Sequence, residues 1–195
     1  DLVESHPDWV MRTAEYEPLL GRSQYILDLT NAEVQTFIID LLTRSIEDFG
    51  VSYIKWDMNR HMTDPASNLP NRTHANEYSH RYMLGLYRIL DTITTLFPEV
   101  LFENCSSGGG RLDPGMLYFM PQTWASDNTD GLDRQRIQYG ASYLFPPYSL
   151  TGHVSSVPNH QTGRVIDFET RKHLASSTNM GYEMDIMQLS DHEKA

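Results

Sequence analysis

Short apolar runs alternate with longer amphipathic segments along most of the chain, and this alternation restricts the fold more than any other feature. Five runs are rich in β-branched and aromatic residues and too short for buried helices, which is typical of strands. These predicted strands are 51–57, 100–105, 122–126, 150–155 and 181–186, with a weaker sixth candidate at 24–29. Strands that alternate with helices form parallel sheets through right-handed crossovers. The sequence therefore predicts the α/β class.

Helical spacing of apolar residues predicts the segments between the strands. The predicted helices are 34–49, 74–97, about 130–144 and about 167–179. Thr30 and Glu33 have the capping-box pattern before the first helix, and Gly50 ends it. Residues 1–23 contain Pro and Gly at several positions and are predicted to be mostly loop.

The length of the chain, 195 residues, leaves two architectures for such a sheet. A closed (β/α)8 TIM barrel takes about 250 residues, so the chain is either the later strands of a barrel or a complete doubly wound open sheet. Nucleotide binding has little support, because no G-x-G-x-x-G follows the first strand and SSGGGR at 106–111 lacks the Lys-Ser/Thr of a phosphate loop. We therefore expect a partial TIM barrel.

Charge and composition argue against several classes of partner. The net charge of −11 and the lack of Lys and Arg clusters argue against a nucleic acid or an anionic membrane. No apolar stretch approaches the length of a membrane span. The single cysteine, Cys105, excludes an internal disulfide and favours a reducing compartment such as the cytoplasm. Because the chain opens at Asp1 without an initiator Met, we expect a piece of a longer protein whose targeting signals lie elsewhere.

Two aspartates stand where predicted strands give way to polar segments: Asp57 in YIKWDMNR and Asp127 in TWASDNTD. In a parallel α/β barrel the carboxyl ends of the strands carry the catalytic groups, so acids from two strand ends can meet at one substrate. Paired carboxylates are the groups that cleave glycosidic bonds. Asp57 and Asp127 are therefore the candidate catalytic residues.

The neighbours of Asp57 favour an ionised carboxylate. In a continuous strand, Lys55, Asp57 and Asn59 point to one face. The lysine stabilises the carboxylate as an anion, which suits a nucleophile, and Asn59 is placed to donate a hydrogen bond to a sugar hydroxyl. The alternative is a structural salt bridge at a strand end, which is common.

Asp127 lies in a run of small polar residues that also fits a helix N-terminus. Thr129 and Asp130 already supply cap candidates, which leaves Asp127 available to face a cleft. There the negative charge of Asp57 would raise the pKa of Asp127 into the range of a general acid. On composition alone, both the cap and the general acid stay open.

Other residues near the strand ends are candidates for binding. The run ENCSSGGG at 103–110 places Cys105 before a glycine-rich turn whose backbone amides can approach a ligand closely. A thiol nucleophile needs a histidine base, and since no local pattern selects one, a polar contact is favoured. Trp124 is either core or a stacking platform for a sugar ring. The histidines lack the spacing of a site such as H-E-x-x-H, so we expect no metal and no other cofactor.

Three stretches resemble one enzyme family. YIKWDMNRH at 53–61, LFENCSSGGGRLDPGMLYFMPQTWASDNTD at 101–130 and HVSSVPNHQTGR at 153–164 are similar to the α-galactosidases of glycoside hydrolase family 36, the melibiases. The opening stretches DLVESHPDWV and GRSQYILDLT resemble the segment after the third barrel strand in that family. The resemblance therefore spans nearly the whole chain.

The resemblance implies a retaining α-galactosidase that acts by double displacement on small galactosides of the melibiose and raffinose type, without a metal. Asp57 matches the nucleophile at the end of strand four, and Asp127 matches the acid/base at the end of strand six. By the same matching, the substrate-contacting positions are Arg22, Lys55, Asn59, Cys105, Gly108 and Trp124.

The resemblance also implies that residues 1–195 are only part of the enzyme. Family members have an N-terminal β-sandwich, a complete barrel and a C-terminal β domain, whereas this chain corresponds to about strands four to eight of one catalytic domain. We expect the isolated fragment to be inactive or to aggregate, and the full-length protein to be a homo-oligomer, such as the tetramer of bacterial members. The alternative functions are a galactosyl-transferring relative of the raffinose-synthase type and a non-catalytic carbohydrate-binding barrel.

Overall fold

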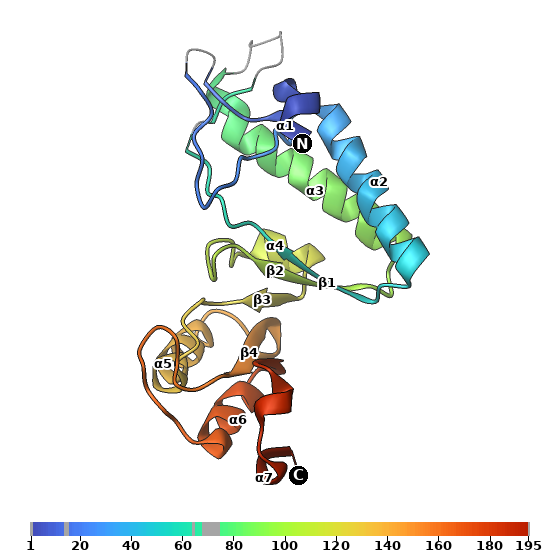
Figure 1. Cartoon of the computed structure of the whole chain (residues 1–195). Helices are drawn as coiled ribbons and strands as arrows, with labels where there is room; N and C mark the ends of the chain where they lie inside the picture. The colour runs from blue at the N-terminus through green and yellow to red at the C-terminus, as the bar shows by residue number, and fades with distance from the viewer. Residues whose placement is uncertain (1, 14–15, 64, 68–74, 195) are drawn as a thin grey trace. The chain divides into compact units, whose positions relative to one another are not determined.

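In the part of the chain that the structure describes, five strands form one sheet whose spatial order repeats their order in the sequence (Figure 1). The computed structural model describes residues 2–13, 16–63, 65–67 and 75–194. The strands are β1 (Tyr53–Asp57), β2 (Leu101–Cys105), β3 (Gln122–Trp124), β4 (Leu150–Ser155) and β5 (Asn179–Glu183). Strands β2 to β5 pair in parallel. The five main predicted strands and the α/β class are therefore confirmed, although β5 spans Asn179–Glu183 and not 181–186.

The order of the strands decides between the two architectures that the length leaves open. A doubly wound open sheet reverses its strand order at a switch point. Here each strand neighbours the next one in sequence without a reversal, which is how the wall of a barrel is built. The sheet is therefore consistent with part of a TIM barrel.

Helices connect the strands close to the predicted positions. The α-helices are α1 (Leu2–Ser5), α2 (Ala32–Phe49), α3 (Tyr78–Leu96), α4 (Pro114–Phe119), α5 (Gly131–Ala141), α6 (Phe168–Ser176) and α7 (Asp191–Lys194). Short 3₁₀ turns are η1 (Pro7–Trp9), η2 (Ala75–Glu77), η3 (Pro147–Ser149) and η4 (Ile186–Gln188). Among the described residues, no helix combines the length and the apolar character that a membrane crossing requires.

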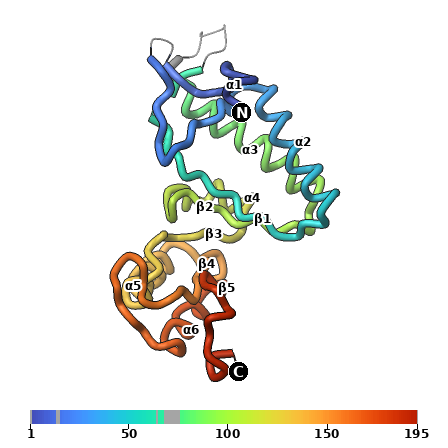
Figure 2. Tube along the Cα trace, viewed as in Figure 1, coloured from blue at the N-terminus to red at the C-terminus, as the bar shows by residue number. Residues whose placement is uncertain are grey.

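The chain divides into two compact units, which we call the helical unit (residues 1–54 and 58–101) and the sheet unit (residues 55–57 and 102–195). In the helical unit α2 packs along α3 (Figure 2). Both helices bury apolar residues at helical spacing, which are Val34, Ile46, Leu86, Ile89, Leu90 and Ile93. In the sheet unit α6 packs on β4 and β5, and α5 packs on α6.

Asn31, rather than Thr30, caps helix α2. The Asn31 side chain accepts a hydrogen bond from the backbone N–H of Glu33 at 2.9 Å. The hydroxyl of Thr30 instead donates to the Asp28 carboxylate at 2.6 Å. The predicted N-cap is therefore wrong by one residue, because the Thr30 hydroxyl is already hydrogen-bonded to the Asp28 carboxylate. Gly50 ends the helix as predicted, in the left-handed region with φ of 62°.

The weak strand candidate at 24–29 is not a strand. Leu27 forms a single antiparallel bridge with Val10, and the backbone N–H of Met11 donates to the Ile26 carbonyl at 2.9 Å. The apolar run is thus buried against the segment that precedes it and does not join the sheet. Local composition did not reveal this because the partner segment carries no strand pattern.

Buried arginines fasten the helices of the sheet unit to strand β4. Arg134 of α5 is 3% exposed, and its guanidinium donates to the carbonyl of Thr151 at 2.9 Å. Arg171 of α6 donates to the carbonyl of Ser155 at the end of the same strand. A buried guanidinium is tolerated only where its donors find acceptors. These bonds therefore set the position of α5 and α6 on the sheet.

Candidate active site

Alternation along the strands places a row of polar and aromatic side chains on one face of the sheet unit. In a parallel pair, registered residues point to the same side, and so does every second residue of a strand. Trp124 is registered with Thr151, which lies two residues before His153. Ser155, two residues after His153, is registered with Glu183. Trp124, His153 and Glu183 therefore share one face.

Asp57 is the last residue of β1 and is exposed to solvent. Cys105, at the end of the neighbouring strand β2, hydrogen-bonds to it through its side chain. The pKa of the Cys105 thiol is raised to about 11, first by burial and then by the hydrogen bond to Asp57 and its charge. A thiol that stays protonated at neutral pH is a poor nucleophile but a competent donor. The structure therefore supports a polar contact, not a thiol nucleophile.

Lys55 lies on the same exposed side of β1 as Asp57 and contacts the next two strands. Its Nζ atom is 3.3 Å from Oε1 of Glu103 on β2 and 4.7 Å from the centroid of the Trp124 ring on β3. The Glu103 side chain is only 2% exposed, so the lysine supplies the counter-charge that a buried carboxylate needs. Sequence spacing indicated Asp57 as the partner of Lys55 and gave no signal for Glu103.

Asp127 is exposed and is held by the indole of Trp124. The Nε1–H of Trp124 donates to Oδ1 of Asp127 at 3.0 Å. The cap of α5 is Asp130, whose carboxylate accepts hydrogen bonds from the backbone N–H groups of Leu132 and Asp133, both at 3.1 Å. The sequence left two interpretations of Asp127 open, a helix cap and a general acid. Because Asp130 caps α5, Asp127 is not the helix cap.

Gly108 allows the turn after β2 to approach the segment that carries Asp127. Its φ is 86°, in the region that favours glycine. A Cβ atom at this position would lie 2.8 Å from the backbone nitrogen of Asp127 and 2.8 Å from the Cα atom of Ser126. Any larger residue would therefore push the two loops apart, which explains the glycine without reference to a ligand.

Arg22 and Asn59 lie together in the helical unit. The Nη1 atom of Arg22 donates to Oδ1 of Asn59 at 2.6 Å, and the Arg22 backbone has a φ of 52°. Strand β1 ends at Asp57, so Asn59 lies beyond the strand. The structure shows its pairing with Arg22, another candidate residue, which the sequence did not indicate.

Residues that the sequence did not single out surround the Trp124 ring. The His153 ring stacks on it with a centroid distance of 4.4 Å and an interplanar angle of 27°. The Cζ atom of Arg134 is 4.1 Å from the same ring centroid. Nδ1 of His153 is 3.2 Å from Oε2 of Glu183. Strand register brings His153 and Glu183 to Trp124, and the packing of α5 on the sheet brings Arg134, so no local sequence pattern could have found these residues.

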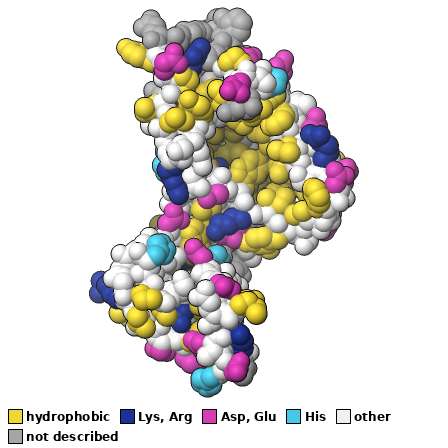
Figure 3. Space-filling model, in the orientation of Figure 1, with side chains coloured by type: hydrophobic (Ala, Val, Ile, Leu, Met, Phe, Trp, Pro, Cys, Tyr) yellow, Lys and Arg dark blue, Asp and Glu magenta, His cyan; other side chains and the backbone are white. Residues whose placement is uncertain are grey.

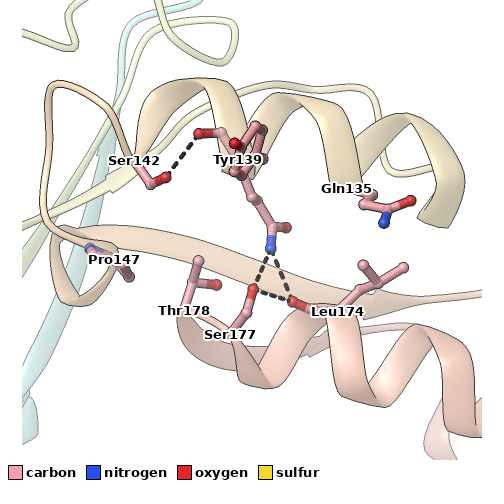
Figure 4. A pocket seen from close by; sticks show the side chains of 8 residues that line it. Gln135, Tyr139, Ser142, Pro147, Leu174, Ser177 and Thr178 are labelled. Carbon is pink, nitrogen blue, oxygen red and sulfur yellow. Dashed lines mark hydrogen bonds between the residues drawn. The ribbon is translucent and has the colours of Figure 1, made fainter.

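The sheet unit also contains a pocket, of about 280 Å³, lined by residues of α5, η3 and α6 and by the segment that follows α6 (Figure 4). The Gln138 side chain crosses it and donates to the Leu174 carbonyl at 2.8 Å and to the Ser177 hydroxyl at 2.9 Å. None of the candidate site residues lines this pocket. In the described part of the chain, no group of three or more His, Cys, Asp and Glu side chains is arranged to hold a metal ion.

Fold and site together define an α/β chain whose candidate catalytic groups stand at the carboxyl ends of parallel strands, as in barrel enzymes. Comparison with known proteins gives the family. The Melibiase family matches residues 1–195, and the chain belongs to that family.

Named relatives are similar over the whole chain but are much longer. Alpha-galactosidase AgaA of Geobacillus stearothermophilus is 50% identical over 194 residues, which cover 100% of this chain and 27% of the relative. Alpha-galactosidase 1 of Pediococcus pentosaceus is 48% identical over 193 residues, 99% of this chain and 26% of the relative. The chain therefore spans about a quarter of the length of these relatives.

Solved structures agree with the fold. The crystal structure of GH36 alpha-galactosidase AgaA has a TM-score of 0.94 and covers 100% of this chain, which in turn covers 27% of AgaA. The alpha-galactosidase of Lactobacillus brevis, 42% identical, has a TM-score of 0.95 over 99% of this chain and 26% of its own. A variant of AgaA was crystallised in complex with raffinose.

Proposed function

We propose that the complete protein to which residues 1–195 belong is a retaining α-galactosidase that hydrolyses terminal α-galactosides of the melibiose and raffinose type. The observation that carries the proposal is the presence of two exposed carboxylates, Asp57 at a strand end and Asp127 just after a strand, in one compact unit of a Melibiase-family chain. The substrate class is supported by the AgaA crystals, which contain raffinose in one case and stachyose in another.

In the first step Asp57 attacks the anomeric carbon of the galactosyl group and forms a covalent ester. The bond between that carbon and the departing oxygen breaks, and Asp127 gives its proton to the oxygen. The Cys105 thiol donates to Asp57, so it steadies the carboxylate for attack without competing as a nucleophile. The Trp124 N–H bond to Asp127 fixes the direction of the proton donor.

In the second step Asp127, now ionised, removes a proton from water. The water oxygen attacks the anomeric carbon, the ester bond to Asp57 breaks, and galactose leaves with its original configuration. Retaining enzymes hold their two carboxyl groups about 5 to 5.5 Å apart. We expect this separation between Asp57 and Asp127 in a crystal structure of the complete protein.

The remaining candidate residues bind the galactose ring in this proposal. Lys55 and Arg22 hold ring hydroxyls, and Cys105 with the backbone N–H of Gly108 holds the 2-hydroxyl. Asn59 donates to a further hydroxyl, and Trp124 completes the set of substrate-contacting residues. Within the sheet unit Lys55 lies close to Trp124, and within the helical unit Arg22 lies close to Asn59, so each of these two pairs is supported by its own contact.

Azide rescue tests the roles of the two aspartates in the complete protein. We expect Asp57→Gly and Asp127→Gly to lose most of the turnover of an aryl α-galactoside, because each lacks one half of the machinery. Azide should restore both, but with different products. In Asp57→Gly, azide takes the place of the nucleophile and gives the inverted β-galactosyl azide. In Asp127→Gly, azide attacks the covalent intermediate and gives the α-galactosyl azide.

The opposite products would show that Asp57 and Asp127 have exchanged roles. Wild-type turnover in Asp57→Gly would overturn the assignment of Asp57 as the nucleophile. Product analysis with an added sugar acceptor completes the test. Free galactose as the main product supports hydrolysis, whereas a galactosylated acceptor as the main product would indicate a transferase of the raffinose-synthase type. Binding of galactosides without any product would indicate a carbohydrate-binding barrel.

We also propose that residues 1–195 belong to a single (β/α)8 catalytic domain and supply about its strands four to eight. The unreversed strand order supports this placement. In the proposal, other parts of the complete protein supply the first barrel strands, the N-terminal β-sandwich and the C-terminal β domain. In the proposal the complete protein is cytoplasmic and assembles as a homo-oligomer. Sedimentation analysis of the purified protein would measure its oligomeric state.

A further inference from the structure

We infer that His153 and Glu183 are positioning residues for Asp127 and act through the indole of Trp124. The inference rests on the proposed function of Asp127 as acid/base and adds two residues from neighbouring strands to that function. Neither residue needs to touch the substrate, because a continuous series of contacts leads from Glu183 to the proton donor.

The contacts run across three consecutive strands. Nδ1 of His153 on β4 lies 3.2 Å from Oε2 of Glu183 at the end of β5. The His153 ring stacks on Trp124 of β3 with 4.4 Å between the centroids. The indole N–H of Trp124 then donates to Asp127 at 3.0 Å. Each contact lies within hydrogen-bonding or stacking range.

The plane of the indole determines where its N–H points. An indole N–H lies in the ring plane, so rotation of the Trp124 side chain would move the donor away from Asp127. Stacking of the His153 ring at an interplanar angle of 27° opposes that rotation. The His153 ring, together with the Arg134 guanidinium 4.1 Å from the same ring centroid, therefore helps to keep the indole N–H directed at Asp127.

Two features of β5 hold His153 in place. Glu183 accepts the hydrogen bond of the imidazole. Gly181, registered with His153, leaves the room that the ring occupies, since a Cβ atom there would lie 2.8 Å from Cδ2 and 3.0 Å from Nε2 of His153. The φ of Gly181 is not in the left-handed region, so backbone conformation does not explain the glycine and space for His153 does.

The charges around Glu183 favour the same arrangement. The pKa of Glu183 is lowered, first by the hydrogen bond to His153 and, against the opposing effect of burial, by the nearby charges of His153, Lys55 and His160. The negative charges of Glu183 and Asp127 both favour the charged form of the Arg134 guanidinium. Glu183 therefore stays ionised and accepts a hydrogen bond from the Nδ1–H of His153. Its negative charge also balances the positive charges of Lys55 and Arg134 near the Trp124 ring.

The test compares four variants of the complete protein. Glu183→Gln removes the charge and weakens the bond to His153. His153→Phe keeps a ring to stack on Trp124 but cannot bond to Glu183. Gly181→Ala displaces the His153 ring directly. Glu169→Gln is the matched control, because Glu169 on α6 has an exposed carboxylate whose salt-bridge partner is the exposed Lys172.

The measurement is kcat/KM for two substrates, melibiose and a dinitrophenyl α-galactoside. The ratio kcat/KM reports the step in which the departing oxygen takes its proton. Melibiose has a poor leaving group that needs a well-placed acid, whereas a dinitrophenolate leaves with little help. We expect Gly181→Ala to lose about tenfold more activity on melibiose than on the aryl galactoside, His153→Phe and Glu183→Gln to show a smaller differential loss in the same direction, and Glu169→Gln to match wild type.

Equal losses on both substrates in Glu183→Gln would overturn the inference, because a contact to galactose or a general structural defect affects both substrates alike. Unchanged activity in that variant would overturn it as well. Glu183 is half-exposed, so this variant decides the matter even where Gly181→Ala fails to fold. A wild-type protein that cleaves neither substrate would overturn the proposed function itself, whereas an active wild type with unaffected variants overturns only the role of His153 and Glu183.

Discussion

At alkaline pH, ionisation of the Cys105 thiol makes the stability of the fold depend on pH. Its pKa in the folded chain is about 11 against an ordinary value of 9.0, with burial as the first cause. Between these values the unfolded chain loses the proton and the folded chain keeps it, so stability is fully present below pH 9.0 and falls as the pH rises towards 11.

We predict that the urea midpoint of the complete protein, followed by tryptophan fluorescence, falls less steeply across this pH range in Cys105→Ala than in wild type. The alanine variant removes this titration and leaves the other groups in place. Equal slopes in both proteins would show that the thiol is not held protonated by burial and by Asp57.

Sequence reasoning located residues whose position depends on their place along the chain. The positions of Asp57 and Asp127 near strand ends could be predicted, because a strand end is visible in the composition. Glu103 and Glu183 could not be predicted, because their importance comes from the residue opposite them on the next strand. Such pairing depends on register, which a single sequence does not specify.

At the scale of elements, apolar periodicity predicted the long helices and the strands well, because burial of one face needs that periodicity. Helix ends were predicted less well. The cap of α2 moved from Thr30 to Asn31 because Asp28 competes for the threonine hydroxyl. Side-chain competition of this kind is decided by local geometry, to which the order of residues alone gives no access.

A glycine inside α3 shows how closely two elements of the helical unit approach. A Cβ atom at Gly85 would lie 1.9 Å from the carbonyl oxygen of Leu29, a backbone atom that also accepts a hydrogen bond from Gln35 at 2.7 Å. We predict that Gly85→Ala destabilises the region by about 1 to 3 kcal/mol, the usual range for overpacking. Hydrogen exchange of the α3 amides in the complete protein measures the change in opening free energy.

Gly140→Ala is the matched control for this prediction. Gly140 also lies in a helix, α5, but nothing lies within 4 Å of a Cβ atom placed there. The same substitution should therefore stabilise that helix by about 0.5 to 1 kcal/mol, because alanine loses less backbone entropy than glycine. Faster exchange in α5 of Gly140→Ala, or unchanged exchange in α3 of Gly85→Ala, would contradict the packing argument.

At the scale of the whole molecule, the described chain presents surfaces that stable monomers normally cover. Strands β1 and β5 are the edges of the sheet, whereas a closed barrel has no edges. Figure 3 shows hydrophobic side chains gathered on the visible face of the helical unit. Large exposed hydrophobic residues of the chain include Phe49, Tyr118, Tyr143, Leu144 and Tyr148. These surfaces support the proposal that other barrel strands and domains cover this chain in the complete protein.

A chimera tests whether this chain supplies a working part of the site. With 50% identity and a TM-score of 0.94 to AgaA, residues 1–195 should replace the matched segment of that enzyme, since the sheet edges would meet strands of the expected geometry. We predict that the chimera releases galactose from raffinose and that Asp57→Gly in the chimera abolishes this activity. Residues 1–195 expressed alone should be inactive or aggregate, because the edges and the hydrophobic face stay uncovered. A chimera that folds to the thermal stability of AgaA but releases no galactose would show that this chain lacks the groups the chemistry requires, whatever its fold.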